Sequence, residues 1–372
     1  MPEINIPAEF LPVDGRFGCG PSKVRPAQLT AFAAEGAKLM GTSHRQAPVK
    51  NLVKRVQEGL MELFHNPAGY EIVLGNGGST AFWDAAAFSM VEKKAQNLVH
   101  GEFGGKFASA LTNPWLEKPT VINGEPGSRL ELKAEAGVDS YAYAQNETST
   151  GVVTPVKRVA GADASALMFT DATSAAGGID FDATETDVYY FAPQKNFASD
   201  GGLWFALMSP QAIERTERIA KTDRYIPEFL SVKTAIDNSR LNQTLNTPAI
   251  ATLFFLAEQI DWMNGNGGLA WADQQTKAAS DHLYSWADAS AFATPFVTNP
   301  EHRSQVVVTI DFDDAIQATE ISKVLRANGI VDVDSYRKLG RNQLRVATFT
   351  ATEIEDVKKL TKAIDFVVGE LA

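Results

Sequence analysis

The chain has 372 residues, of which 44% are hydrophobic and 21% are charged, and these proportions are ordinary for a soluble folded protein. A chain of this length is too long to fold around one small hydrophobic core, so two domains are expected. The formal net charge of -11 argues against general binding of nucleic acid or of a membrane surface, because both favour basic patches.

The cysteine and histidine content excludes further classes. Cys19 is the single cysteine, so one chain can form neither an internal disulfide nor a cysteine-based metal site, and the five histidines show no metal-ligand spacing. The N-terminus lacks the basic start and apolar run of a signal peptide, and no apolar stretch approaches the length of a membrane span. We therefore expect a cytoplasmic protein with no metal and with no nucleic-acid or membrane partner.

Helical and strand patterns alternate through the first two thirds of the chain. A Pro-rich arm, residues 1–16, and a turn-rich stretch, residues 17–22, come first. Apolar strands alternating with helices then predict an α/β layered fold with a mostly parallel sheet. The predicted helices include residues 26–40, 49–64, 80–94 and 103–111. The predicted strands are residues 71–74, 97–100, 120–122, 140–144 and 166–170, with two apolar runs on either side of Lys195.

The last third of the chain has a different texture. A helical pattern over residues 248–263 ends at an Asn- and Gly-rich stretch, residues 264–268, which indicates a helix stop and a hinge. We predict a large domain of residues 17–265 and a smaller α+β domain of residues 1–16 and 266–372. Its predicted helices are residues 269–287, 319–328 and 353–371, and its predicted strands are residues 304–312, 329–333 and 343–349.

Lys195 lies between two apolar, β-prone runs, which is an unusual place for an ammonium group. One interpretation is a lysine in a tight turn with its amine in water. The other is a buried lysine whose lowered pKa makes it a nucleophile toward a carbonyl. On this segment alone the first interpretation is favoured.

Three further motifs follow strand candidates. The glycine-rich turn at residues 75–80 has two interpretations, a site for one phosphate at a helix N-terminus or an ordinary βα turn, and the turn alone favours neither. Asp171 ends a strand, where it can cap a helix or face a cationic ring nitrogen. Residues 144–151 form a polar turn in which Asn146 and Thr148 could bond a ring hydroxyl, although a plain turn is favoured. An acid and a lysine at neighbouring strand ends fit pyridoxal phosphate.

Together these motifs resemble a known family. The segments that carry the resemblance are residues 17–22, Gly-Thr-Ser-His-Arg at 41–45, Asn-Glu-Thr at 146–148, Ala-Pro-Gln-Lys-Asn at 192–196 and Asn-Thr-Pro-Ala at 246–249. In this order they resemble class V, fold-type I pyridoxal-phosphate aminotransferases, and within these the phosphoserine aminotransferases of the divergent actinobacterial form. The resemblance covers essentially the whole chain and implies a three-layer large domain with a smaller C-terminal domain.

The resemblance implies a set of cofactor residues. Lys195 matches the lysine that bonds the cofactor, and Asp171 matches the partner of the ring nitrogen; both are the implied catalytic residues. Phe103 falls where better-known members carry a tryptophan stacked on the ring. The other implied contacts to pyridoxal phosphate are Gly78, Ser79, Thr148, Gln194, Asn246 and Thr247. Asn246 and Thr247 match residues that reach the neighbouring subunit's cofactor, which implies an obligate homodimer with active sites at the interface.

The resemblance also implies the substrate contacts and the reaction. His44 and Arg45 match a substrate-binding pair, and Arg345 matches the arginine that clamps the α-carboxylate. Arg337 is expected to meet the substrate phosphate, with Lys338 or Arg341 as open alternatives in the same loop. The implied activity is reversible transamination between O-phospho-L-serine and 2-oxoglutarate, giving 3-phosphohydroxypyruvate and L-glutamate in serine biosynthesis.

Two other interpretations stay open. Another class V activity, such as serine– or alanine–glyoxylate aminotransferase, would not need the additional phosphate-binding cations. A cofactor-free binding protein is the alternative of a different class, and the intact set of Lys195, Asp171 and Thr148 argues against it. Cysteine desulfurase is disfavoured because Cys19 lies in the turn-rich stretch near the N-terminus.

Overall fold

The structure is a computed structural model that describes residues 4–371. Its main feature is a seven-stranded sheet in the order β1-β9-β8-β7-β4-β2-β3. All neighbours from β8 to β3 are parallel, whereas β9 runs antiparallel to both β1 and β8. The predicted α/β fold with a mostly parallel sheet is confirmed. The strands are β1 (Glu71–Asn76), β2 (Ala95–Val99), β3 (Thr120–Asn123), β4 (Ser140–Ala144), β7 (Leu167–Asp171), β8 (Val188–Phe191) and β9 (Leu203–Met208).

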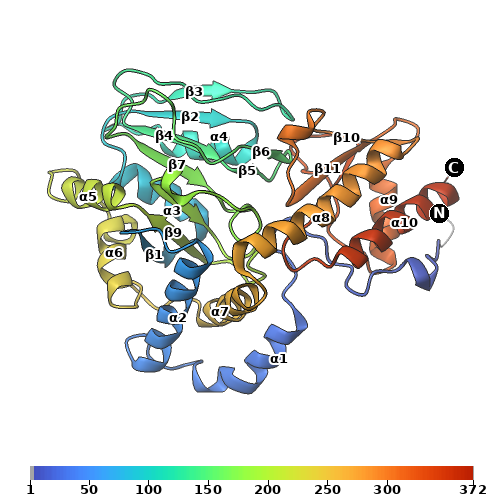
Figure 1. Ribbon diagram of the computed structural model, residues 1–372, viewed down its shortest axis with the longest axis horizontal. Coiled ribbons are helices and arrows are strands. Elements are labelled where there is room, and N and C mark those ends of the chain that lie inside the picture. The colour runs from blue at the N-terminus through green and yellow to red at the C-terminus, as the bar shows by residue number, and fades with distance from the viewer. Residues whose placement is uncertain (1–3, 372) are drawn as a thin grey trace.

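Helices cover both faces of this sheet, which gives three layers (Figure 1). Strand β8 shows the reason, because its side chains alternate between the faces: Tyr189 and Phe191 pack with α2 and α7, and Val188 and Tyr190 pack on the other side. A sheet that is apolar on both faces must be covered on both. The helices around it are α1 (Pro26–Glu35), α2 (Ala47–Leu63), α3 (Gly78–Ser89), α4 (Glu102–Ala110), α5 (Pro210–Ile219), α6 (Val232–Arg240) and α7 (Ile250–Gly265).

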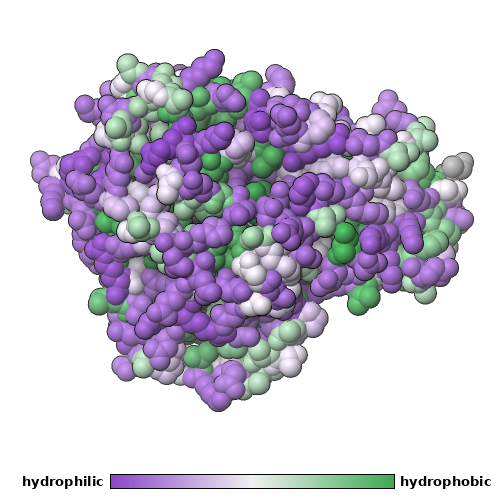
Figure 2. Space-filling model, viewed as in Figure 1, coloured by the Kyte–Doolittle hydropathy of each residue, from purple (hydrophilic) through white to green (hydrophobic). Residues whose placement is uncertain are grey.

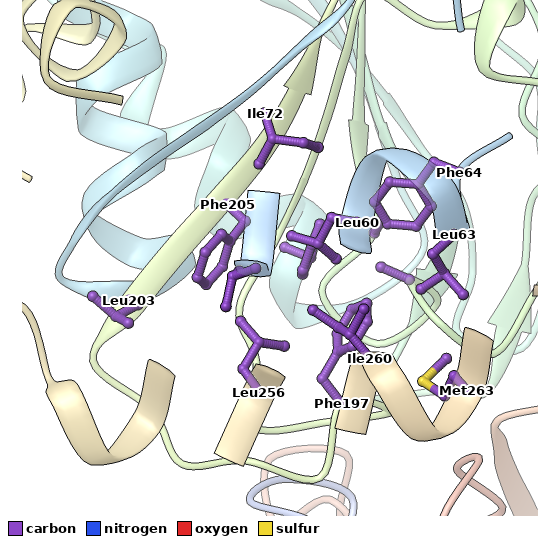
Figure 3. Packing of buried hydrophobic residues seen from close by; sticks show 14 of the residues in the cluster. Leu60, Leu63, Phe64, Ile72, Phe197, Leu203, Phe205, Leu256, Ile260 and Met263 are labelled. Carbon is purple, nitrogen blue, oxygen red and sulfur yellow. The ribbon is translucent and has the colours of Figure 1, made fainter. Parts of the chain in front are cut away.

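The turn that carries Lys195 is anchored in one of these cores. Phe197, two residues after the lysine, stacks on Phe191 with ring centroids 4.9 Å apart. Figure 3 shows Phe197 beside Leu256 and Ile260 of α7, with Leu60 of α2 near by. The apolar residues on both sides of Lys195 are therefore buried, and the backbone at the lysine is fixed between them.

A second unit lies at the C-terminal end of the chain. Its three-stranded antiparallel sheet, in the order β10-β11-β12, packs with α8, α9, α10 and the N-terminal arm, and both termini lie there (Figure 1). Helix α8 links the units, because Leu269 packs in the large core and Leu283 in the small one. The boundary at residue 265 stays a prediction. The elements of this unit are β10 (Ala293–Pro295), β11 (Val307–Phe312), β12 (Gln343–Ala347), α8 (Gly268–Ala289), α9 (Ala318–Ala327) and α10 (Ile354–Leu371). A separate two-stranded ribbon, β5 (Asn146–Glu147) and β6 (Val152–Val153), lies beside the large sheet.

Several sequence-based boundaries were wrong. The helix predicted over residues 80–94 ends at Ser89, because the Asp139 carboxylate accepts the backbone N–H groups of residues 92–94 and holds that segment as a connection to β2. The strand predicted over residues 329–333 forms only an isolated bridge between Val331 and Arg16, since Asp332 has a φ of 64°. Helix α1 ends at Glu35 rather than at residue 40, and α5 and α6 were not predicted.

The visible face of the molecule is mainly hydrophilic, with scattered hydrophobic groups (Figure 2). Within residues 4–371, no helix combines the length and the hydrophobicity needed to cross a bilayer. The large apolar side chains that remain exposed include Met40, Tyr225, Phe229 and Leu241.

Candidate active site

The sheet brings the predicted residues together at the carboxyl ends of its parallel strands. Asp171 is the last residue of β7 and lies in register with Ala144 of β4 and Tyr190 of β8. Thr148 follows β4 after three residues, and Lys195 follows β8 after three. Carboxyl ends of neighbouring parallel strands share one edge of a sheet, which is where α/β folds bind ligands.

Lys195 is buried, with 8% of its surface exposed. Its Nζ donates a hydrogen bond to the Cys19 carbonyl oxygen and lies 5.9 Å from the centre of the Phe103 ring. Burial, followed by the nearby Arg345 charge, lowers the pKa of Lys195 to about 8, although other neighbours oppose the shift. The amine thus has a large neutral fraction near pH 8, as a nucleophile or base requires.

Asp171 is also buried, and its carboxylate is held from two sides. Oδ1 accepts the Thr173 backbone N–H at 2.9 Å. Tyr190 and Trp83 lie near the same carboxylate, and the Trp83 Nε1–H donates to the Tyr190 hydroxyl at 2.9 Å. Burial nevertheless raises the pKa of Asp171, so a cation facing this group would favour its charged form.

The glycine turn opens helix α3. Gly78 has a φ of 69°, and no heavy atom lies within 4 Å of where its Cβ would be, so a ligand can approach the backbone there. The next residue, Ser79, bonds Thr173 through the hydroxyls at 2.7 Å. The Gln194 side-chain oxygen is buried and has no hydrogen-bond partner among residues 4–371. The free N–H groups at the helix N-terminus suit a phosphate group, to which the Gln194 amide would have to present its N–H₂ rather than its oxygen.

Arg345 of β12 reaches this cluster from the small sheet. Its guanidinium donates to the Thr148 carbonyl oxygen at 3.0 Å and lies 5.3 Å from the centre of the Tyr336 ring. The Nε of Arg345 is buried and lacks a partner within the described chain. The Thr148 hydroxyl itself donates to Ser174 at 2.8 Å. One donor of a guanidinium fork is therefore uncommitted at the site.

The basic loop contributes its three cations unequally. Lys338 is ion-paired with Glu102 of α4. Arg341 is ion-paired with Asp311 and lies over the Phe296 ring at 4.5 Å. Arg337 is exposed and forms no ion pair within residues 4–371. Between α4 and this loop, a cavity of about 470 Å³ is lined by Tyr336, Lys338 and Leu339 of the loop but not by Arg337.

The remaining four predicted residues form a separate cluster. The His44 Nδ1 and the Thr247 hydroxyl are 3.3 Å apart, and Arg45 donates to Gln243 and to the Leu245 carbonyl oxygen. Asn246 accepts from Asn76 at the end of β1. No hydrogen bond among residues 4–371 joins these four residues to Lys195, Asp171 or Arg345. Within one chain these four residues therefore form a second cluster, apart from the one around Lys195.

Sequence reasoning missed Glu147, which is completely buried. Its carboxylate accepts the backbone N–H groups of Phe103 and Gly104 at 3.2 and 3.0 Å and the Ser149 hydroxyl at 2.6 Å. Glu147 therefore fixes the first turn of α4 and with it the Phe103 ring. The signal was present, since an acid lay inside the turn at residues 144–151. The contacts of Tyr190, Trp83 and the Cys19 carbonyl were also missed, because no motif marks them.

The residues present fit the predicted cofactor. Each part of the cofactor has a matching group in the site. The Lys195 amine can be neutral, the buried Asp171 carboxylate can face a cationic ring nitrogen, the Phe103 ring offers an aromatic face, and the N-terminus of α3 has free N–H donors. A buried amide oxygen and a buried guanidinium nitrogen without partners are rare unless a ligand satisfies them.

Comparison with known proteins gives matches along the whole chain. The family model described as aminotransferase class-V matches residues 124–335. A putative phosphoserine aminotransferase of Mycolicibacterium vanbaalenii is 60% identical over 369 residues, covering 99% of each chain. A phosphoserine aminotransferase of Rhodococcus opacus is 58% identical over 98% of each chain.

Solved structures show the same fold. The phosphoserine aminotransferase of Cytophaga hutchinsonii superposes with a TM-score of 0.87 at 23% identity, covering 95% of this chain and 99% of that one. A phosphoserine aminotransferase of Trichomonas vaginalis with bound PLP has a TM-score of 0.80 at 19% identity, over 95% of this chain and 99% of that one.

Proposed function

The chain belongs to the class-V aminotransferase family, and we propose that it is a phosphoserine aminotransferase that uses pyridoxal phosphate. It transfers the amino group from O-phospho-L-serine to 2-oxoglutarate, reversibly, and the products are 3-phosphohydroxypyruvate and L-glutamate. The observation that carries the proposal is the buried Lys195 amine at one edge of the sheet, 5.9 Å from the centre of the Phe103 ring and within the electrostatic influence of Asp171 and Arg345.

The residues around Lys195 would hold the cofactor. Lys195 would bond it, Asp171 would pair with the ring nitrogen, and Phe103 would face the ring. The α3 N-terminus at Gly78 and Ser79, with Gln194, would receive the phosphate, and Thr148 would bind the ring oxygen. Bound pyridoxal phosphate draws electrons from the substrate's α-carbon, which makes the proton there acidic.

Lys195 and Asp171 supply the proton chemistry. When its amine is free, Lys195 Nζ takes the proton from the α-carbon of the amino substrate, and a pKa of about 8 leaves much of that amine neutral. Asp171 stays anionic opposite the cationic ring nitrogen, because that charge offsets the burial that raises its pKa. The Tyr190 and Trp83 contacts hold its carboxylate in place.

Arg345 and Arg337 would bind the two anionic ends of phosphoserine. Arg345 presents its uncommitted Nε to the α-carboxylate. Arg337 meets the phosphate, because Lys338 and Arg341 are already paired with Glu102 and Asp311. A cation that must leave a carboxylate partner before binding substrate is a weaker choice than an unpaired one.

We further propose that two chains form a homodimer in which each active site draws on both. The half-site of His44, Arg45, Asn246 and Thr247 is then completed by the Lys195 cluster of the partner subunit. Two features support this arrangement: no hydrogen bond among the described residues, 4–371, joins the two clusters, and the exposed apolar side chains Met40 and Leu241 lie in the segments next to the first of them. Closed two-fold dimers are the commonest assembly.

A coupled assay tests the proposed activity. We expect the purified protein with pyridoxal phosphate to act on phosphoserine and 2-oxoglutarate with a kcat/KM at least about tenfold above that for alanine and glyoxylate, because only phosphoserine engages the phosphate-binding cation. The reverse preference would favour an alanine– or serine–glyoxylate aminotransferase. Protein that gains no visible absorbance on addition of pyridoxal phosphate would favour a cofactor-free role.

Mixing two inactive variants tests the shared site. Arg45→Ala and Lys195→Ala each remove one half-site, but a mixed dimer retains one complete site. Random pairing after co-refolding should then restore about a quarter of the wild-type activity. If the mixture stays as inactive as its components, the two half-sites do not meet across an interface.

A further inference from the structure

The segment Phe17–Ser22 connects the small sheet with the turn that carries Lys195. At one end, the Phe17 carbonyl oxygen accepts the Ala347 N–H of β12 at 3.0 Å. At the other end, the Ser22 N–H donates to the Gln194 carbonyl oxygen at 2.8 Å, and the Ser22 hydroxyl donates to the Lys195 carbonyl oxygen at 2.5 Å. The segment is therefore fixed to the backbone at the lysine, independently of what the lysine side chain does.

The middle of this segment receives the Lys195 side chain. The amine donates to the Cys19 carbonyl oxygen. At the next residue, Gly20, a Cβ would lie 2.6 Å from Lys195 Cε and 3.0 Å from Cδ, with the amine nearer still. Real Cβ atoms do not approach other heavy atoms so closely. The lysine thus occupies space that exists only because residue 20 has no side chain.

We propose that the Cys19 carbonyl and the bare Gly20 backbone form a resting site for the Lys195 amine whenever that amine is not bonded to the cofactor. This inference rests on the proposed function, in which Lys195 alternates between a bonded and a free state. A free amine this deeply buried needs a hydrogen-bond acceptor, and the Cys19 carbonyl supplies one. The two residues are positioning residues: they hold Nζ in one orientation while it is free.

The resting site makes a thermodynamic prediction about two ligands. Pyridoxamine 5′-phosphate has no aldehyde and leaves Lys195 free, whereas pyridoxal 5′-phosphate bonds it. A Cβ at residue 20 disfavours every state with a free lysine, namely the apo protein and the pyridoxamine phosphate complex. The affinity for pyridoxamine phosphate should therefore change little, while the affinity for pyridoxal phosphate should rise relative to it.

The test is a titration of apo protein with each ligand. In Gly20→Ala, the ratio of the Kd for pyridoxamine phosphate to the Kd for pyridoxal phosphate should increase about tenfold over wild type, or ~1.4 kcal/mol. Gly20 has a φ of 134°, so alanine also strains the backbone, but that strain is the same in all states and cancels in the ratio. Gly137→Ala is the matched control, because Gly137 also has a positive φ, 81°, and open space around it.

A double-mutant cycle on the apo protein gives a second, activity-free readout. Gly20→Ala should lower the Tm more in the wild-type background than in Lys195→Ala, where the opposing side chain is gone. This comparison remains available if the single variant folds poorly. An unchanged ratio of Kd values, or additive changes in Tm, would overturn the resting site. Wild-type protein that fails to bond pyridoxal phosphate at Lys195 would instead overturn the proposed function.

Discussion

The Lys195 cluster and the basic loop at residues 336–341 show two ways of holding functional groups. Lys195, Asp171 and Thr148 stand at strand ends and are all less than a tenth exposed, so the register of the sheet and the packing beneath it fix them. Arg337 and Lys338 stand on an exposed loop, where ion pairs decide which side chain is free. The first region is preorganised to hold a cofactor in one pose, and the second is adjustable to a substrate that comes and goes.

The contrast extends to energetics. Groups in the buried cluster have their pKa values shifted mainly by burial, as for Lys195 and Asp171. In the loop, the pKa of Lys338 is raised by its hydrogen bond and ion pair with Glu102. Substitutions in the first region should therefore act on the chemical step, and those in the second on substrate binding.

Substitution of Lys195 by alanine should give the largest loss. We expect kcat to fall by about 10⁴-fold, because this one amine both bonds the cofactor and moves the α-proton. The coupled phosphoserine assay measures it, and the exposed Lys157→Ala serves as the control that should keep wild-type kcat. A Lys195→Ala protein that turns over within tenfold of wild type would remove the lysine from the mechanism.

Asp171→Asn should have the next largest effect. The amide has nearly the same shape but cannot supply the negative charge that keeps the ring nitrogen protonated, so we expect kcat to fall by about 100-fold. The KM for phosphoserine should change less than threefold, since Asp171 lies away from the substrate cations. If KM rises as much as kcat falls, the carboxylate is involved in substrate binding, and the division between the two regions fails.

The arginines of the basic loop provide a matched pair. Arg337→Gln should raise the KM for phosphoserine about tenfold with kcat nearly unchanged, because it removes a charged hydrogen bond to the phosphate. Arg341→Gln should change KM less than twofold, since Arg341 is paired with Asp311 and stacked on Phe296. Steady-state kinetics of both variants decide the point. The opposite pattern would assign the phosphate to Arg341.

The same contrast explains what could be predicted from the sequence. Apolar runs that alternate with helical patterns indicated the sheet, and a polar residue at a strand end has its place set by register, so Asp171 and Lys195 could be located. The choice among Arg337, Lys338 and Arg341 could not be predicted, because their partners Glu102 and Asp311 are distant in sequence. Backbone contacts, such as the Cys19 carbonyl to Lys195, leave no signal in residue types. The early end of α3 depended on Asp139, some fifty residues further along the chain.

The smallest predicted effect is a dependence of apo stability on pH. Burial lowers the pKa of Lys195 from 10.5 to about 8 in the folded chain, so between these values the unfolded state binds a proton that the folded state lacks. Stability therefore rises with pH in this window, and below pH 8 the buried ammonium costs its full penalty. The free energy of unfolding of the wild type, measured relative to that of Lys195→Met, should increase by ~1 kcal/mol between pH 7 and pH 9. Urea denaturation of both apo proteins at one protein concentration measures the difference, and a difference independent of pH would mean that the amine reaches water.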